Sequence, residues 1–155
     1  MLQLISGPAL AADQSLRLIP LHTDRLTLAK RLWRAPAEDG KEFGFELSAP
    51  LKPGDTFWVS HEARYVVYQR PEPVVEIALD LPPSAAAGIG WAVGNLHLEL
   101  SAEPARLLAP DEPAVRQLLE RLKVSYTPTI AVFRPGRFAR GNQPASQELG
   151  PSHRH

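Results

Sequence analysis

The chain has 155 residues, of which 44% are hydrophobic and 22% charged, the composition of a globular protein with room for one domain or two small ones. Its 17 basic and 17 acidic residues cancel to a formal net charge of +0, so no overall field attracts nucleic acid or an anionic membrane, and we expect neither as a partner. The absence of cysteine excludes disulfides and thiolate metal sites and leaves imidazole and carboxylate groups as the strong metal ligands.

The N-terminal segment MLQLISGPALAADQ contains a small-residue stretch that resembles a signal-peptide cleavage site. No basic residue precedes it, and Gly7-Pro8 interrupts the apolar run after a few residues. No later stretch approaches the ~18 apolar residues of a membrane span. We therefore expect a soluble, cytoplasmic protein.

Residues 1–70 are predicted to form a small all-β domain, a possible peptide- or partner-binding module. RLTLAKRLW (residues 25–33) and KEFGFEL (residues 41–47) both alternate apolar and polar residues, and the Asp39-Gly40 pair between them is typical of a hairpin turn. The segments TFWVS and YVVYQ are rich in β-branched and aromatic residues and predict further strands. In the QRPEP stretch, Pro71 and Pro73 favour a linker.

Residues 74–138 are predicted to form a second domain with alternating strands and helices. VVEIALD reads as a strand, PPSAAAGIGWAV as a helix ending at Gly94, LHLEL and RLLA as two strands, and TPTIAVFRP as the last strand. The second helix is capped by Asp111, and its apolar face has the spacing i, i+3, i+4, i+7, from Val115 to Leu118, Leu119 and Leu122. The order βαββαβ predicts an α+β, ferredoxin-like domain with both helices on one sheet face and the other face open.

His97 interrupts the leucine alternation of LHLEL. In a strand, the leucines face the core, and His97 and Glu99 face the other way. Gly94-Asn95 is predicted to end the preceding helix, so His97 follows a helix-to-strand corner. Imidazole is a good ligand for nickel and zinc, but one histidine cannot hold a divalent ion against water, so further ligands must converge on it.

Residues 139–155 form a predicted flexible tail that contains His153 and His155, two further candidate ligands. His22 and His61 lie in turn-like or polar contexts of the β domain, where structural or exposed roles are expected. Trp33, Trp58 and Trp91 are predicted to be packing residues.

Several of these segments, in this order, resemble the UreE family of urease accessory proteins, which act as nickel metallochaperones. The resemblance rests on EDGKEFGFEL and LKPGDTFWV, the GNLH corner, the helix in LAPDEPAVRQLLERL, and TPTIAVFRP, and it spans roughly residues 26–138. It implies an N-terminal β domain followed by a ferredoxin-like metal-binding domain, with His97 as the principal nickel ligand. Where many members have a histidine at the second helix, this chain has Asp111 and Glu112, so we expect no extra site there. The usual basic residue of the corner is replaced by Leu96.

We therefore expect a non-enzymatic homodimer that binds Ni(II) as cargo, with Zn(II) as a possible competitor. The predicted ligands are His97 of both subunits, near the two-fold axis, and His153 or His155. The expected partners are the GTPase UreG and the urease apoprotein complex. Two alternatives stay open: a metal-dependent enzyme that uses His97, Glu99 and tail ligands, and a peptide-binding assembly module that binds metal incidentally.

Overall fold

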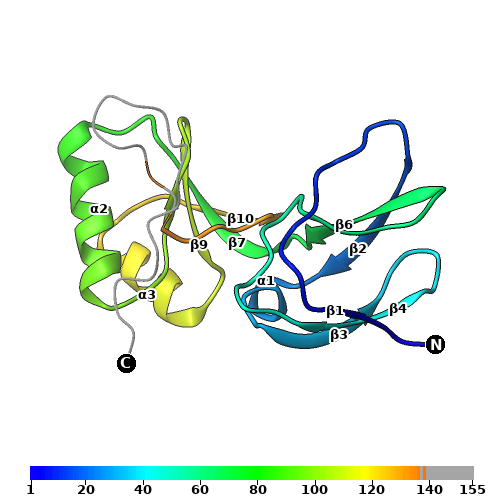
Figure 1. The fold of residues 1–155 in the computed structure, drawn as a ribbon. Helices are drawn as coiled ribbons and strands as arrows, with labels where there is room; N and C mark the ends of the chain where they lie inside the picture. The colour runs from blue at the N-terminus through cyan, green and yellow to red at the C-terminus, as the bar shows by residue number, and fades with distance from the viewer. Residues whose placement is uncertain (137, 139–155) are drawn as a thin grey trace. The chain divides into compact units, whose positions relative to one another are not determined.

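A computed structural model describes residues 1–136 and 138 of the chain. It combines helices with mixed sheets, as predicted for an α+β protein. Contacts between residues divide the chain into two compact units, Met1–Arg70 and Pro71–His155 (Figure 1). None of the helices within the described residues is long and apolar enough to cross a membrane.

The N-terminal unit contains two three-stranded sheets, with strand orders β1-β4-β3 and β2-β6-β5. The strands are β1 (Gln3–Ile5), β2 (Arg17–Thr23), β3 (Leu32–Pro36), β4 (Glu42–Glu46), β5 (Thr56–Val59) and β6 (Ala63–Gln69). The predicted hairpin is confirmed, since β3 pairs with β4 in antiparallel fashion across the Asp39-Gly40 turn, where Gly40 has φ +85°. Strands β1 and β2, which pair in parallel with β4 and β6, were not predicted from the sequence.

The predicted strand at residues 25–33 is wrong in its first half. Residues Arg25–Leu28 form the short helix α1, so the unit is not purely β. The Asp24 carboxylate accepts a hydrogen bond from the Thr27 backbone N–H at 2.8 Å, which is the bond of a helix N-cap. Leu26 is consequently 67% exposed, and only Leu28 faces the core.

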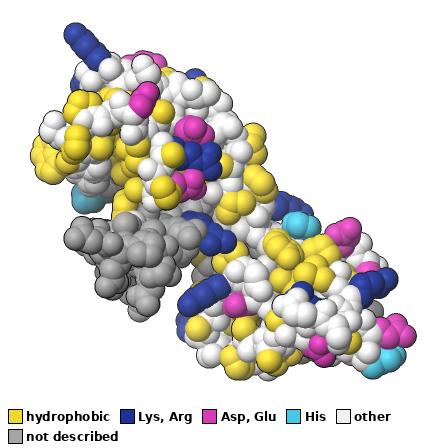
Figure 2. Space-filling view, turned by 90° about the horizontal axis from the view of Figure 1, so that it is seen from above, with side chains coloured by type: hydrophobic (Ala, Val, Ile, Leu, Met, Phe, Trp, Pro, Cys, Tyr) yellow, Lys and Arg dark blue, Asp and Glu magenta, His cyan; other side chains and the backbone are white. Residues whose placement is uncertain are grey.

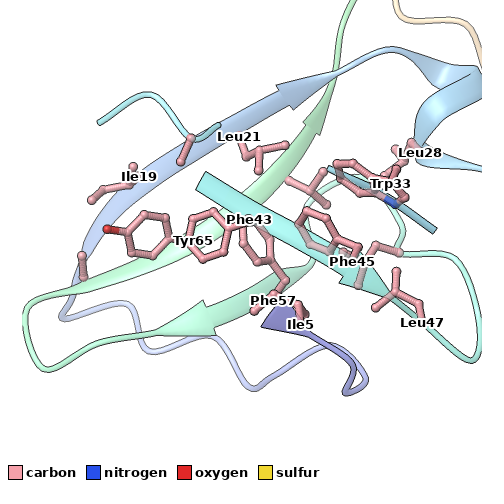
Figure 3. Close-up of a cluster of buried hydrophobic side chains, with 14 residues drawn as sticks. Ile5, Ile19, Leu21, Leu28, Trp33, Phe43, Phe45, Leu47, Phe57 and Tyr65 are labelled. Carbon is pink, nitrogen blue, oxygen red and sulfur yellow. The ribbon is translucent and has the colours of Figure 1, made fainter. Parts of the chain in front are cut away.

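The core of this unit is aromatic (Figure 3). Phe43 and Phe45 of β4 are almost fully buried, as their alternation predicts, and Trp33 stacks on Phe45 with ring centroids 3.9 Å apart. The Tyr65 hydroxyl donates a 2.6 Å hydrogen bond to the Asp39 carboxylate. Burial and this carboxylate raise the pKa of Tyr65 to about 12, so the phenol stays protonated and keeps the hairpin turn attached to the core.

The C-terminal unit contains one antiparallel sheet of order β10-β7-β9-β8 and two helices. Its elements follow the predicted order strand, helix, strand, strand, helix, strand (Figure 1). They are β7 (Glu72–Ala78), α2 (Pro83–Asn95), β8 (Ser101–Ala102), β9 (Arg106–Pro110), α3 (Pro113–Arg121) and β10 (Thr127–Ala131). Pro73 lies within β7 and not in a linker, and its carbonyl accepts a hydrogen bond from the Asp111 N–H.

Helix α3 has the predicted apolar face, with Val115, Leu118 and Leu119 buried. Leu122 is 40% exposed because it is the C-cap of the helix and no longer faces the core. The predicted cap is also wrong: Glu112 occupies the N-cap position, without a capping side-chain bond, and Asp111 lies one residue earlier.

The sheet face away from the helices is partly covered, whereas the sequence predicted an open face. Phe133, fully buried, packs on that face against Val74 of β7 and Leu108 of β9. The neighbouring Val75 and Leu107 belong to the separate core between the sheet and the helices, as the alternation of a strand requires. The chain after β10 therefore covers part of the second face.

Candidate metal centre

His97 lies at the C-terminal end of helix α2, and not in a strand as predicted. The helix continues through Asn95, Leu96 is its C-cap, and the second strand of the unit is only Ser101–Ala102. The His97 N–H donates to the Gly94 carbonyl at 3.0 Å and the Leu98 N–H to the Val93 carbonyl at 3.1 Å. These two bonds form a Schellman motif, in which the residue at the His97 position takes the left-handed conformation.

The backbone of His97 has φ +55°, a region that glycine occupies most readily. The Gly94-Asn95 pair was predicted to make this turn, but both residues are helical, and His97 makes it instead. Leu98 packs against the hydrophobic core between the sheet and the helices of the C-terminal unit, whereas the His97 side chain is exposed. A side chain at a position that favours glycine is strained, so His97 lowers the stability of this turn relative to glycine.

Helix α3 ends in the same way and provides an internal comparison. Lys123 has φ +56°, its N–H donates to the Glu120 carbonyl at 3.1 Å, and the Val124 N–H donates to the Leu119 carbonyl at 2.9 Å. Lys123 and His97 thus hold equivalent positions in the two Schellman motifs. The histidine supplies a possible metal ligand at one of them, and the lysine, usually protonated, does not.

The outer face of α2 is exposed and uncharged. The helix sequence PSAAAGIGWAVGN contains no charged residue, and Trp91 is 72% exposed, which contradicts its prediction as a packing residue. Leu96, at the end of the helix beside His97, is 45% exposed. Figure 2 shows hydrophobic side chains at the surface of this unit. Uncharged surfaces with exposed aromatic side chains are typical of the centres of protein interfaces.

Asp111 is not available as a metal ligand, because Arg116 binds its carboxylate. The guanidinium donates from Nε to Oδ1 at 2.6 Å and from Nη2 to Oδ2 at 2.8 Å. The hydrogen bonds of this pair, and then the attraction between its opposite charges, lower the pKa of Asp111 and raise that of Arg116. Each carboxylate oxygen therefore accepts one hydrogen bond from the guanidinium, and a metal ion would have to compete with that cation.

We expect Asp111→Asn to leave nickel binding unchanged and to lower stability at neutral pH. The lowered pKa means that the charged pair stabilises the fold above the unfolded-state pKa of ~3.9, and that this stabilisation is lost as the pH falls through the folded-state pKa. Thermal unfolding of both proteins from pH 7 to pH 2.5 should show melting temperatures that converge at acid pH. A parallel loss of nickel binding would instead make Asp111 a ligand.

The other histidines of the chain belong to other parts of the sequence. His22 and His61 belong to the N-terminal unit, where both are exposed, His22 next to the Tyr68 ring and His61 3.5 Å from Glu62. His153 and His155 lie outside the described residues. Within residues 1–136 and 138, no three histidine, aspartate or glutamate side chains form a group that could hold a metal ion.

Comparison with known proteins identifies the family. The sequence profile described as "UreE urease accessory protein, C-terminal domain" matches residues 72–155, more than half of the chain. The chain is also 28% identical over 116 residues to a curated protein of Bifidobacterium longum subsp. infantis named "Urease accessory protein UreE". That alignment covers 72% of this chain and 49% of the relative, so the chain spans about half the length of the curated relative it matches. Residues 72–155 contain the whole helix and sheet unit with His97 at its exposed corner, and on this evidence the chain belongs to the UreE family of urease accessory proteins, which are not enzymes.

Proposed function

We propose that this protein is a nickel carrier that supplies Ni(II) for assembly of the urease active site. The observation that carries the proposal is the exposed His97 at the end of the uncharged helix α2, where it is the only histidine among the described residues of the C-terminal unit. Family membership supports nickel as the metal that this imidazole binds, because urease accessory proteins serve a nickel enzyme. Imidazole also binds Zn(II), so zinc is the expected competitor.

We propose further that two copies of the chain pair across the outer face of α2. A two-fold axis brings the same residue of both subunits together, and two imidazoles can hold an ion that one would lose to water. The face is uncharged, carries Trp91 and ends beside His97. The unit of residues 74–138 would then be the ferredoxin-like metal-binding domain and residues 1–70 a partner-binding domain. The recipients of the ion would be UreG and the urease apoprotein complex.

Titration calorimetry with nickel and with zinc tests this function by measuring the number of ions bound per dimer. Sedimentation measures the mass of the dimer. We expect one tightly held nickel ion per dimer. Binding should weaken as the pH falls, because a protonated imidazole cannot coordinate a metal. Absence of tight binding, or one independent ion per monomer, would contradict the shared site.

Removing residues 150–155, which include His153 and His155, should weaken nickel binding and leave the dimer and the fold unchanged. The tail histidines would add ligands to the His97 pair, and losing a tethered ligand costs affinity. The matched control is His153→Gln with His155→Gln in the full-length chain, which should weaken binding to the same extent. Equal affinity of the truncated and full-length proteins would remove both histidines from the site.

A further inference from the structure

The segment between β1 and β2 crosses the β2-β6-β5 sheet on its outer face, the face away from the aromatic core. Leu10 pairs with Thr56 of β5 at one edge of this sheet, and the Leu10 N–H donates to the Thr56 carbonyl at 2.7 Å. Strand β2 is the opposite edge. Between the two edges, the Gln14 side chain contacts Arg64 of the central strand β6. Residues 11–16 therefore pass over the sheet from edge to edge, and we call them the crossing segment.

Arg64 lies on this outer face and is only 9% exposed. Its neighbours Ala63 and Tyr65 belong to the aromatic core, so the alternation of the strand directs Arg64 to the other face. Leu18 of β2 and Val59 of β5 pair with Arg64 in register, and they are 37% and 36% exposed. Paired residues of neighbouring strands project to the same face. The guanidinium is therefore buried on a face where an aliphatic side chain flanks it on each side.

The charge of Arg64 has no carboxylate partner in the part of the chain that the structure describes. Its Nη2 donates to the neutral amide oxygen of Gln14 at 3.0 Å, and its Nε has no hydrogen-bond partner there. The Asp13 carboxylate instead accepts bonds from the Ser15 hydroxyl at 2.6 Å and the Ser15 N–H at 2.9 Å. Those bonds lower the pKa of Asp13 most, and attraction to Arg64 is the smallest contribution. A buried cation without an anion lowers stability, and an anion that reaches it is bound favourably.

Arg116 shows how the same group of atoms is filled elsewhere in the chain. Its Nε and Nη2 donate to the two carboxylate oxygens of Asp111, which is the two-bond geometry that a guanidinium forms with a carboxylate. In Arg64 the equivalent Nη2 has only the amide of Gln14, and the equivalent Nε has nothing among the described residues. Arg64 thus presents the donor pair of a carboxylate site without the carboxylate.

A second unpartnered donor lies on the same face, under an exposed segment. The Thr56 hydroxyl is buried and has no hydrogen-bond partner within the described residues. Thr56 pairs with Val66, which is two residues from Arg64 along β6 and shares its face. Residues 11–15 of the crossing segment are all exposed. Because exposed segments with little buried apolar surface open at low free energy, the crossing segment can move aside for a ligand.

We propose that the outer face of the β2-β6-β5 sheet binds an acidic segment of a partner protein, whose carboxylate displaces Gln14 and pairs with Arg64. The inference rests on the partner-binding role proposed for residues 1–70 and not on nickel binding. Apolar neighbours of the acidic residue would contact Leu18 and Val59, and the exclusion of water by these contacts strengthens the ion pair. Nucleic acid fits less well, because it is bound by several exposed cations, whereas Arg64 is buried between aliphatic positions.

Two fluorescent peptides test this recognition in the full-length protein without metal. One alternates valine and glutamate, and the other has glutamine in place of each glutamate. We expect fluorescence anisotropy to show that the parent protein binds the acidic peptide at least about tenfold more tightly. Arg64→Met removes the charge but keeps a long side chain, and it should bind both peptides equally. The matched control is Arg34→Met, which removes an exposed cation from the other sheet of the same unit and should leave the preference unchanged.

Two substitutions of Gln14 should change the affinity for the acidic peptide in opposite directions. Gln14→Ala removes the competing amide, and we expect binding about threefold tighter. Gln14→Glu supplies a carboxylate within the chain at high effective concentration, and we expect binding weaker by about tenfold or more. Gln14 is exposed, so both variants should fold, and thermal unfolding verifies this for every variant. If Arg64→Met does not fold, the opposite effects of the two Gln14 variants decide the question.

Equal binding of the acidic and neutral peptides by the parent protein would overturn the proposal. Acidic-peptide binding that survives in Arg64→Met, or Gln14 variants that act in the same direction, would also overturn it. Inorganic phosphate or a single-stranded oligonucleotide that binds in preference to the peptide, and only when Arg64 is present, would identify a phosphate ligand and contradict a protein partner. Nickel titration of Gln14→Glu should match that of the parent protein. Failure of the nickel-carrying function would therefore appear as absent nickel binding and would leave the peptide result unaffected.

Discussion

Replacing His97 with glycine should abolish the tight nickel site and at the same time stabilise the protein. The substitution removes one imidazole from each subunit of the proposed dimer, and we expect nickel affinity to fall by roughly a hundredfold or more, ~2.7 kcal/mol. Glycine adopts the φ of +55° at this position without the steric cost that a side chain pays. The expected gain is about 1 kcal/mol, or about 4 °C in the melting temperature.

The opposite signs of the two effects make the result decisive, because loss of binding could not be attributed to unfolding. Lys123→Gly is the matched control, since Lys123 has the same conformation and the same two hydrogen bonds at the end of α3. It should raise the melting temperature similarly and leave nickel binding unchanged. His97→Ala should lose nickel binding with little change in stability, because alanine and histidine are both strained in the left-handed conformation. If the His97→Gly protein still binds one tight nickel ion per dimer, His97 is not a ligand of that ion.

The order of elements in the C-terminal unit could be predicted because the segments differ clearly in pattern. Strand β7 is a short apolar, β-branched run, and helix α3 has apolar residues with a period of about 3.6; both appear where the sequence indicates. The His97 corner could not be predicted in detail. LHLEL has the period of a strand, but only Ser101–Ala102 pair in the sheet, because the Schellman motif takes up the first residues after the helix.

The role of His97 as a metal ligand stays a prediction, but its position could be compared with the structure. The sequence placed it after the end of a helix, and the structure puts it in a left-handed turn and not on the polar face of a strand. Trp91 was expected inside, since aromatic residues usually pack, and its exposure depends on which face of α2 meets the sheet. The cover on the second sheet face was missed because Phe133 reads as the end of a strand, and only the three-dimensional structure shows that it packs on Val74 and Leu108.

Replacing Trp91 with glutamate should convert the proposed dimer into monomers. Trp91 is 72% exposed on a helix without charges, and a two-fold axis along that face would bring two new carboxylates close together in an apolar environment. Like charges facing each other across an interface cost several kcal/mol, so we expect the dimer dissociation constant to rise by at least about a hundredfold. Sedimentation velocity over a range of protein concentrations measures this directly.

The matched control is Leu32→Glu, at a side chain that is 74% exposed and belongs to the N-terminal unit and not to α2. It should leave the dimer intact. Nickel titration of both variants then links assembly to binding: Trp91→Glu should lose the tight site although His97 is unchanged, because each imidazole would be left alone against water. If Trp91→Glu remains dimeric, the pairing face lies elsewhere. If it is monomeric and still binds nickel tightly, the ion is held within one chain, and the shared site is wrong even though the interface is right.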